Sequence, residues 1–262
     1  MKGLICGVTL CCLLVTTAAA VQAEEGEGAS GPLAQQKLNP LAFEINLPVT
    51  LSFGVGPHRD PQPTLSFQPR IPLGLTEDWR LVTRSNVSII HTPDPEETTG
   101  LGDIDVSLFL TPARTGAWIF GAGPILQFPT ATDTALGTGK WSAGPTAALV
   151  YVGGPWVNGI LVSHLWSFAG PDSRAAVSLT QIEAQVSYSF PDNWYIDTNP
   201  TISYDWNAPR GERWLIPIGV DVGRAFKIGS QAMSLQLGAY YNVKKPASAT
   251  EWVVQTQLSW SY

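Results

Sequence analysis

Cysteine, charge and long apolar segments are all scarce in this 262-residue chain. Its cysteines, Cys6, Cys11 and Cys12, lie within the first 23 residues, so the rest of the chain has no thiol for a disulfide or a metal site. Charged residues make up 14% of the chain, against about 25% in soluble domains. After residue 23 no apolar run reaches the roughly 18 residues of a membrane helix. Such a chain can still cross a bilayer as a closed β-barrel, in which every backbone polar group is paired.

The first 42 residues are expected to lie outside the folded domain. Residues 1–23 combine a basic start at Lys2, an apolar stretch and the small residue Ala23, which predicts a cleaved secretory signal peptide. Residues 24–42 begin acidic and glycine-rich and show no periodicity, which predicts a flexible periplasmic lead-in. The formal net charge of −6 argues against nucleic acid as a partner.

From residue 43 to the C-terminus, apolar and polar residues alternate with a period of two, as in strands with one apolar face. The last strand is the clearest case, because its aromatic residues and its polar residues occupy opposite parities. The pattern predicts an all-β fold over 43–262, a transmembrane antiparallel β-barrel of about 12 strands. The expected strands lie near 43–53, 62–73, 79–91, 101–111, 117–128, 139–152, 156–168, 176–190, 194–206, 213–226, 231–243 and 251–262.

The connections between these strands alternate in length. Short turns are expected at 76–78, 112–116, 153–155, 191–193 and 227–230, and longer loops at 54–61, 92–100, 129–138, 169–175, 207–212 and 244–250. A barrel with both termini in the periplasm has short turns on that side and longer loops outside. With the export signal, this predicts a bacterial outer-membrane protein in contact with lipid and lipopolysaccharide. The C-terminal strand, which ends at Tyr262, is expected to be recognised by the barrel-assembly machinery.

The ten tryptophans fall into two groups at opposite strand ends. One group lies near the short turns or the C-terminus: Trp79, Trp118, Trp156, Trp194 and Trp260. The other lies beside the longer loops: Trp141, Trp166, Trp206, Trp214 and Trp252. Two such groups indicate the aromatic girdles of a membrane barrel, although tryptophan also fills protein cores.

Prolines conflict with this interpretation. Six fall inside expected strands, where a closed barrel offers no free edge for a residue without an N–H: Pro48, Pro69, Pro124, Pro145, Pro200 and Pro217. Bulges are expected to accommodate them.

Several stretches resemble a family of proteobacterial outer-membrane proteins, often labelled as transporters or as neuromedin U-like, which is related to outer-membrane proteins of phenol meta-cleavage operons. The matching segments, within about 98–262, are LGDID at 101–105, GAGP at 121–124, LGTGKWSAGP at 136–145, HLWSFAG at 164–170 and AYYNVKKP at 239–246. The resemblance implies an outer-membrane barrel and suggests aromatic or hydrophobic solutes. It implies no catalytic motif.

If the apolar parity faces lipid, the other parity lines the lumen. The residues expected there are Arg70, Arg80, Arg84, Asp103, Asp105, Glu183, Asp197, Asp205 and Asp221. The arginines fall on the second and third strands and most acids on the fourth and on the eighth to tenth, which predicts a transverse field across a water-filled lumen. With Glu44 the inward acids outnumber the arginines, which favours cations if the lumen is open. Alternatively, these groups pair and plug the barrel.

These features predict a channel for passive or facilitated passage of small solutes, with no metal, cofactor or catalytic residue. A plugged barrel with a structural or surface-interaction role is one alternative. An outer-membrane lipid hydrolase is another, for which the histidine bases available are His58, His91 and His164.

Overall fold

The computed structural model describes residues 32–56, 59–93, 97–114 and 116–262. The expected signal peptide, the first part of the expected lead-in and His58 lie outside the described residues.

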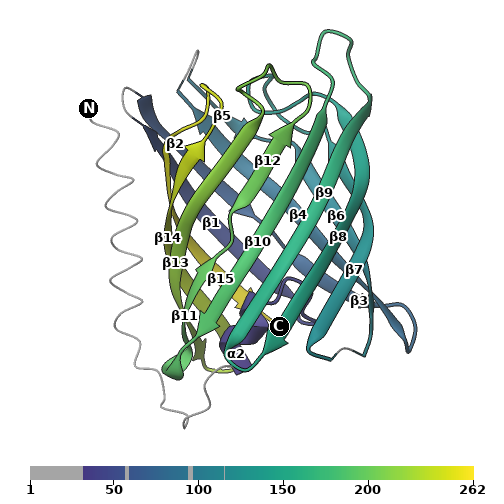
Figure 1. Ribbon diagram of the computed structural model, residues 1–262, viewed down its shortest axis with the longest axis vertical. Coiled ribbons are helices and arrows are strands. Elements are labelled where there is room, and N and C mark those ends of the chain that lie inside the picture. The colour runs from purple at the N-terminus through teal and green to yellow at the C-terminus, as the bar shows by residue number, and fades with distance from the viewer. Residues whose placement is uncertain (1–31, 57–58, 94–96, 115) are drawn as a thin grey trace.

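The strands form one closed antiparallel β-barrel of 12 strands, which confirms the predicted fold (Figure 1). The sheet closes because β1 pairs with β15 and β9 pairs with β10. Three of the 12 strands are interrupted, so their halves carry separate labels: β2 and β3, β5 and β6, and β11 and β12. The segments are β1 Asn46–Gly56, β2 Arg59–Phe67, β3 Arg70–Gly74, β4 Trp79–Thr92, β5 Thr98–Leu101, β6 Ile104–Pro112, β7 Trp118–Phe128, β8 Trp141–Gly153, β9 Trp156–Ala169, β10 Ser178–Ser189, β11 Trp194–Thr198, β12 Thr201–Asp205, β13 Trp214–Ile228, β14 Gln231–Lys244 and β15 Trp252–Ser261.

In the described part of the chain, no helix has the length and apolar character needed to span a membrane.

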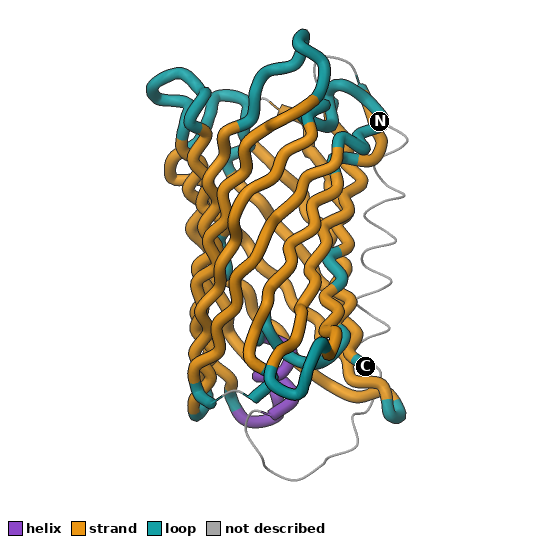
Figure 2. The backbone as a smooth tube through the Cα atoms, turned by 90° about the vertical axis from the view of Figure 1, so that its right-hand side faces the viewer, coloured by secondary structure: helices purple, strands orange, loops and turns teal. Residues whose placement is uncertain are grey.

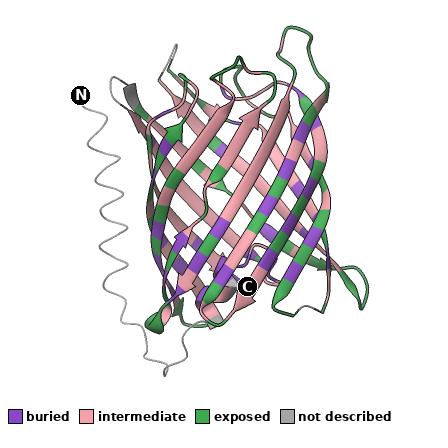
Figure 3. Cartoon of the chain, in the orientation of Figure 1, coloured by how far each residue is buried: buried purple, intermediate pink, exposed green. Residues whose placement is uncertain are grey.

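Side chains alternate between the two faces of the barrel wall, as the period of two predicts. Buried and exposed bands therefore follow one another along the strands (Figure 3). On β10, for example, Ser187 is buried in the interior, whereas Val186, the residue before it, is 49% exposed on the outer surface. The outer surface is apolar and much of the interior is polar, which is the arrangement of a membrane barrel.

Short turns and longer loops gather at opposite ends of the barrel (Figure 2). We call these the short-turn end and the long-loop end. The tryptophans follow the same division, and nine of them stand within one residue of the end of a strand. One predicted loop is wrong: β1 continues to Gly56 and pairs with Arg59 of β2, so 54–61 is mostly strand. Backbone pairing needs no apolar side chain, so it extends past the apolar band that the sequence pattern marks.

Close approaches and breaks or shifts in the ladder accommodate five of the six prolines. Pro124 of β7 and Pro145 of β8 are register partners, and the pairing of each strand with its other neighbour is interrupted beside them. The preceding residues are Gly123 and Gly144, where a Cβ atom would overlap with the backbone carbonyl oxygens of Leu108 and His164. Pro69 and Pro200 lie in the breaks between β2 and β3 and between β11 and β12, and Pro217 follows a register shift in β13.

On one side of the barrel the ladder between neighbouring strands is interrupted, and we call this stretch the wall gap. Asp197 of β11 pairs with Asp221 of β13, and the next pair is Ser203 of β12 with Leu215. Residues 198–202 and 216–220, which include Pro200 and Pro217, form no ladder with one another. Tyr240 of β14 lies over the gap from inside. Its hydroxyl donates a hydrogen bond to Asp221 Oδ2 and accepts one from the backbone N–H of Asn199.

Part of the expected flexible lead-in is instead ordered inside the short-turn end. Helix α2, Pro32–Leu38, and the following residues 39–42 lie within the barrel (Figures 1 and 2). Ala34, Leu38 and Leu41 pack in one cluster with inward-facing apolar side chains from seven strands. These are Val82, Phe109, Ile119, Ala148, Val150, Val157, Leu161, Tyr195 and Ala225. At this end the interior is therefore apolar, and burial of this surface holds α2 in place.

Candidate functional site: the barrel lumen

A series of adjoining cavities leads from the long-loop end into the barrel. The first, of about 600 Å³, lies among the ends of β1, β2, β4 and β15 and the loops. The second, of about 370 Å³, shares Gln62, Thr250 and Val253 with the first and extends to the wall gap. The third, of about 150 Å³, shares Asn199 and Gln255 with the second and reaches Leu38 of α2. The cavity volumes therefore decrease towards the short-turn end, where α2 forms the floor of the lumen.

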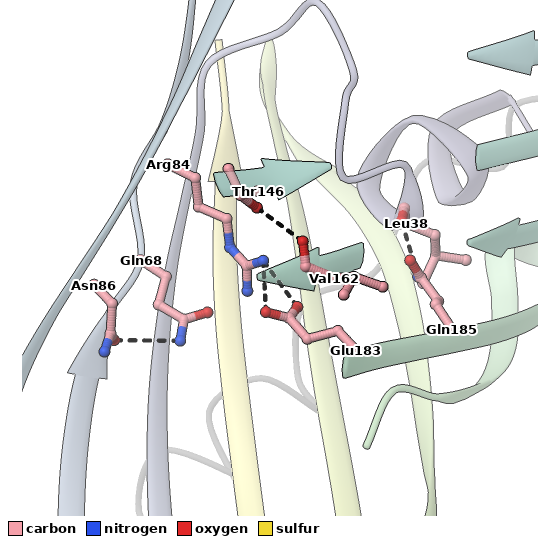
Figure 4. Close-up of polar contacts among 8 residues, drawn as sticks. All are labelled: Leu38, Gln68, Arg84, Asn86, Thr146, Val162, Glu183 and Gln185. Atoms are coloured by element: carbon pink, nitrogen blue, oxygen red, sulfur yellow. Dashed lines mark hydrogen bonds and ion pairs between the residues drawn. The ribbon is translucent and has the colours of Figure 1, made fainter. Parts of the chain in front are cut away.

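We call the third cavity the waist. An ion pair crosses the lumen there. Arg84 Nη1 of β4 donates to both carboxylate oxygens of Glu183 on β10, at 2.9 and 2.8 Å (Figure 4). In the closed sheet, β6 to β9 separate these strands on one side. On the other side, they are separated by β11 to β15 followed by β1 to β3. The pair therefore joins nearly opposite walls, and it divides the lumen at this level.

Basic and acidic side chains occupy different parts of the waist. Lys37 of α2, Arg70 of β3 and Arg84 of β4 lie towards one side, and Glu183, Asp197 and Asp221 line the cavity from β10, β11 and β13. Following the sheet order, these two groups of strands are on opposing walls. Fixed charges so arranged orient dipolar solutes.

The two buried aspartates are already satisfied by neutral donors. Asp197 accepts a hydrogen bond from Ser187 and a longer one, 3.5 Å, from Gln185. Asp221 accepts from Tyr240 and, at 2.8 Å, from Gln255 Nε2. Hydrogen bonds of this kind stabilise a carboxylate without a cation.

The other predicted lumen residues are distributed differently. Arg80 lies over the ring of Phe43, 4.2 Å from its centroid, near the short-turn end. Asp105 is in the wall beside Asn86 and Gln127 and does not line the waist cavity. Asp205 caps the loop after β12 by accepting from the N–H of Asn207 at 2.9 Å. Of the nine residues, the structure brings five together at the waist: Arg70, Arg84, Glu183, Asp197 and Asp221.

Lys37 connects helix α2 to the barrel wall. Its Nζ donates to Ser261 Oγ at 2.6 Å and to the carbonyl oxygen of Ala232 at 3.0 Å. Burial lowers the pKa of Lys37 to about 8, against the attraction of Glu44, which raises it. The ammonium group is therefore still mainly protonated at neutral pH. Gln185 Nε2 adds a bond from the wall to the carbonyl oxygen of Leu38 at 2.8 Å.

The alternation of apolar and polar residues predicts neither α2 nor a role for Lys37. A signal is present in the sequence, because Ala34, Leu38 and Leu41 have the i, i+4, i+7 spacing of one helical face. The spacing does not predict a stable helix here, because a helix of seven residues is only marginally stable without tertiary packing.

Asp103, expected in the lumen, instead organises the long-loop end. Its carboxylate accepts hydrogen bonds from the N–H of Ala131 at 3.2 Å and from the N–H and hydroxyl of Thr138 at 2.6 and 2.8 Å. Arg174 and Lys140 then join this loop to the loop after β9, through bonds to Thr138 O and Pro171 O. Three of the segments that resemble the outer-membrane family, 101–105, 136–145 and 164–170, thus meet in one cluster of loop contacts.

Replacing Asp103 with Ala is expected to loosen the loop over 129–140. The change removes three hydrogen bonds to a partly exposed carboxylate, which should cost about 2 kcal/mol. Limited proteolysis of the purified barrel should show faster cleavage in this loop, with an unchanged transmembrane core. Asp103→Asn keeps one acceptor oxygen, so its cleavage rate should lie between those of wild type and Asp103→Ala. Equal cleavage rates in wild type and Asp103→Ala would contradict this role.

The described histidines do not form a catalytic arrangement with a serine. His164 Nδ1 lies 2.7 Å from Thr180 Oγ1, and its ring centroid is 4.0 Å from that of Trp166. The neighbouring Ser163 is buried on the opposite, inward face. His91 contacts Thr99 Oγ1 at 2.7 Å in an exposed position. Both contacts are with threonine, and neither includes a carboxylate to orient the ring.

The fold and the lumen define the class of the molecule as a 12-strand antiparallel barrel of the outer-membrane type. An outer-membrane channel from Pseudomonas putida F1 matches with a TM-score of 0.62 and 14% identity, over 90% of this chain and 100% of that chain. A NanC porin structure matches with a TM-score of 0.54 and 12% identity, over 82% of this chain and 98% of that chain. At such identities the likeness concerns the fold alone. No protein-family model and no curated protein matches this chain.

Proposed function

We propose that this protein is an outer-membrane channel that passes small polar solutes through its lumen. The observation that carries the proposal is the series of adjoining cavities from the long-loop end to the waist, where polar and charged side chains line them. The fold shared with a bacterial outer-membrane channel and a porin supports it. The export signal expected at residues 1–23 is consistent with this location.

In this proposal the long-loop end faces outwards and both termini lie in the periplasm. The two groups of tryptophans would then stand at the two membrane interfaces, in contact with lipid and lipopolysaccharide. The C-terminal strand, which already pairs with β1 and β14, would be the element that the barrel-assembly machinery recognises.

Passage requires two rearrangements. The Arg84–Glu183 pair must open at the waist, and α2 must move from the floor. Both side chains of the pair keep about a fifth to a quarter of their surface exposed, so solvent competes with this interaction. Helix α2 is short and lies before the first strand, so it can leave without breaking the closed sheet.

The wall gap favours a second candidate function, the lateral passage of aromatic or hydrophobic solutes. Residues 198–202 and 216–220 have no ladder between them, and the second cavity lies behind them. The outer surface beside the gap is a groove of about 390 Å³ that includes Tyr204, Trp206 and Trp214. Tyr240 covers the gap from inside, and it would have to swing away.

The test is single-channel recording of the full protein, purified from outer membranes, beside liposome swelling with a pentose. Discrete conductance and pentose-dependent swelling are expected. The lateral route is tested in parallel by uptake of an apolar fluorescent probe into cells that produce wild type, Tyr240→Phe or Tyr240→Ala.

The two candidates give different results. Conductance and swelling, together with probe uptake that Tyr240→Ala leaves unchanged, support the polar route alone. Faster probe uptake in Tyr240→Ala, but not in Tyr240→Phe, supports the lateral route. Folded barrels with no conductance, no swelling and no probe uptake would refute both and leave a plugged, structural barrel.

A further inference from the structure

The guanidinium group of Arg70 is buried at the waist and forms no hydrogen bond with the part of the chain that the structure describes. The residue is 8% exposed, and its Nε and Nη2 atoms have no acceptor among the described residues. A buried cation with unpaired donors is strongly disfavoured. Its barrel neighbour Asn46 also carries an unpaired buried oxygen, so this side of the waist is incompletely satisfied.

The charges around Arg70 add to this imbalance. Arg84 is its register partner on β4 and repels it. Lys37 approaches from α2 and is also repelled by Arg70. Glu44 attracts both Lys37 and Arg70, but Glu183 is engaged by Arg84. Three cations thus surround one side of a cavity of about 150 Å³, and only Arg84 has an ion-pair partner within bonding distance among the described residues.

We propose that the waist is a binding site for a small oxyanion, with a carboxylate as the preferred group, held by Arg70 and Lys37. The forked donors of a guanidinium match the two oxygens of a carboxylate. Lys37 has two acceptors and a third N–H to donate. The amide side chains of Gln68, Gln257 and Asn46 line the same cavity and supply further polar contacts.

This inference rests on the proposed channel, because the anion must reach the waist through the lumen. It narrows the substrate class to solutes that carry a carboxylate or a similar oxyanion. It also reverses the cation preference that the count of inward acids suggests. Asp197 and Asp221 are hydrogen-bonded to neutral donors, whereas Arg70 has no partner among the described residues.

The experiment measures binding separately from transport. Carboxyl-labelled ¹³C-acetate is titrated into the full protein in a non-ionic detergent, and line broadening of its NMR signal reports binding. Acetamide, a neutral molecule of the same shape, and inorganic phosphate are titrated in parallel. The variants are Arg70→Gln, Arg70→Lys and, as a matched control, Arg224→Gln, whose arginine contacts Trp194 and Asp192 at the short-turn end.

Acetate is expected to bind wild type and Arg224→Gln alike, at least about tenfold more weakly to Arg70→Gln, and with intermediate strength to Arg70→Lys. Acetamide should not bind. Stronger binding of phosphate than of acetate would make phosphate the preferred oxyanion and overturn the carboxylate assignment. No acetate binding to folded wild type, or equal binding to Arg70→Gln, would overturn the site.

Failure of this inference is distinguishable from failure of the proposed function. Conductance without acetate binding refutes the site and keeps the channel. Acetate binding without conductance refutes the channel and keeps the site.

Discussion

Replacing Leu41 with Asp is expected to raise the single-channel conductance several-fold. Leu41 is fully buried in the apolar cluster that holds α2 at the floor of the barrel. The change removes about 2–3 kcal/mol of apolar burial, and an unpaired buried carboxylate costs about 3–5 kcal/mol more. The few hydrogen bonds of Lys37 and Gln185 cannot offset this loss of stabilisation, so α2 should leave the lumen.

Leu41→Met is the matched control, because a volume-conserving change keeps α2 packed at the floor of the barrel. Both variants should retain the closed barrel, since residue 41 precedes the first strand. This is checked by the shift in gel mobility between unheated and heated samples. Folded Leu41→Asp with the conductance of wild type would show that α2 does not control the passage.

Replacing Gly144 with Ala is expected to prevent or severely impair barrel formation. A Cβ at this position would overlap with the backbone carbonyl oxygen of His164 on the adjacent strand. Backbone atoms cannot rotate away as a side chain does, so β8 and β9 would have to separate where Pro145 already omits a ladder bond. The cost should be about 3 kcal/mol or more, the upper part of the range for overpacking.

Gly74→Ala provides the comparison, since nothing lies within 4 Å of the Cβ it would add to β3. The measurement is the urea concentration at which the folded, faster-migrating form is lost. Gly74→Ala should match wild type, and Gly144→Ala should unfold at clearly lower urea or never fold. Equal midpoints for all three proteins would mean that the strands separate easily at this point.

The closed barrel itself was predictable from the sequence. Strand positions, the outward apolar parity and the division of loops by length are local properties, because a period of two decides which face each side chain occupies. The opposition of Arg70 and Arg84 to Glu183 and Asp197 was also predictable, since strand order follows chain order in an up-and-down barrel. Here the prediction needed only the alternation of residues and the count of strands.

The tertiary structure alone decided the state of the lumen. Asp103 and Asp105 share the inward pattern, yet Asp103 binds the loop over 129–140, and no periodicity encodes where a loop returns. Helix α2 gains its stability from apolar side chains supplied by seven strands, and those come together only when the barrel closes. The Arg84–Glu183 pair, the unpaired Arg70 and the wall gap likewise depend on distances across the barrel. Local pattern therefore determined that this chain forms a barrel, and long-range contacts decided how the interior of the barrel is arranged.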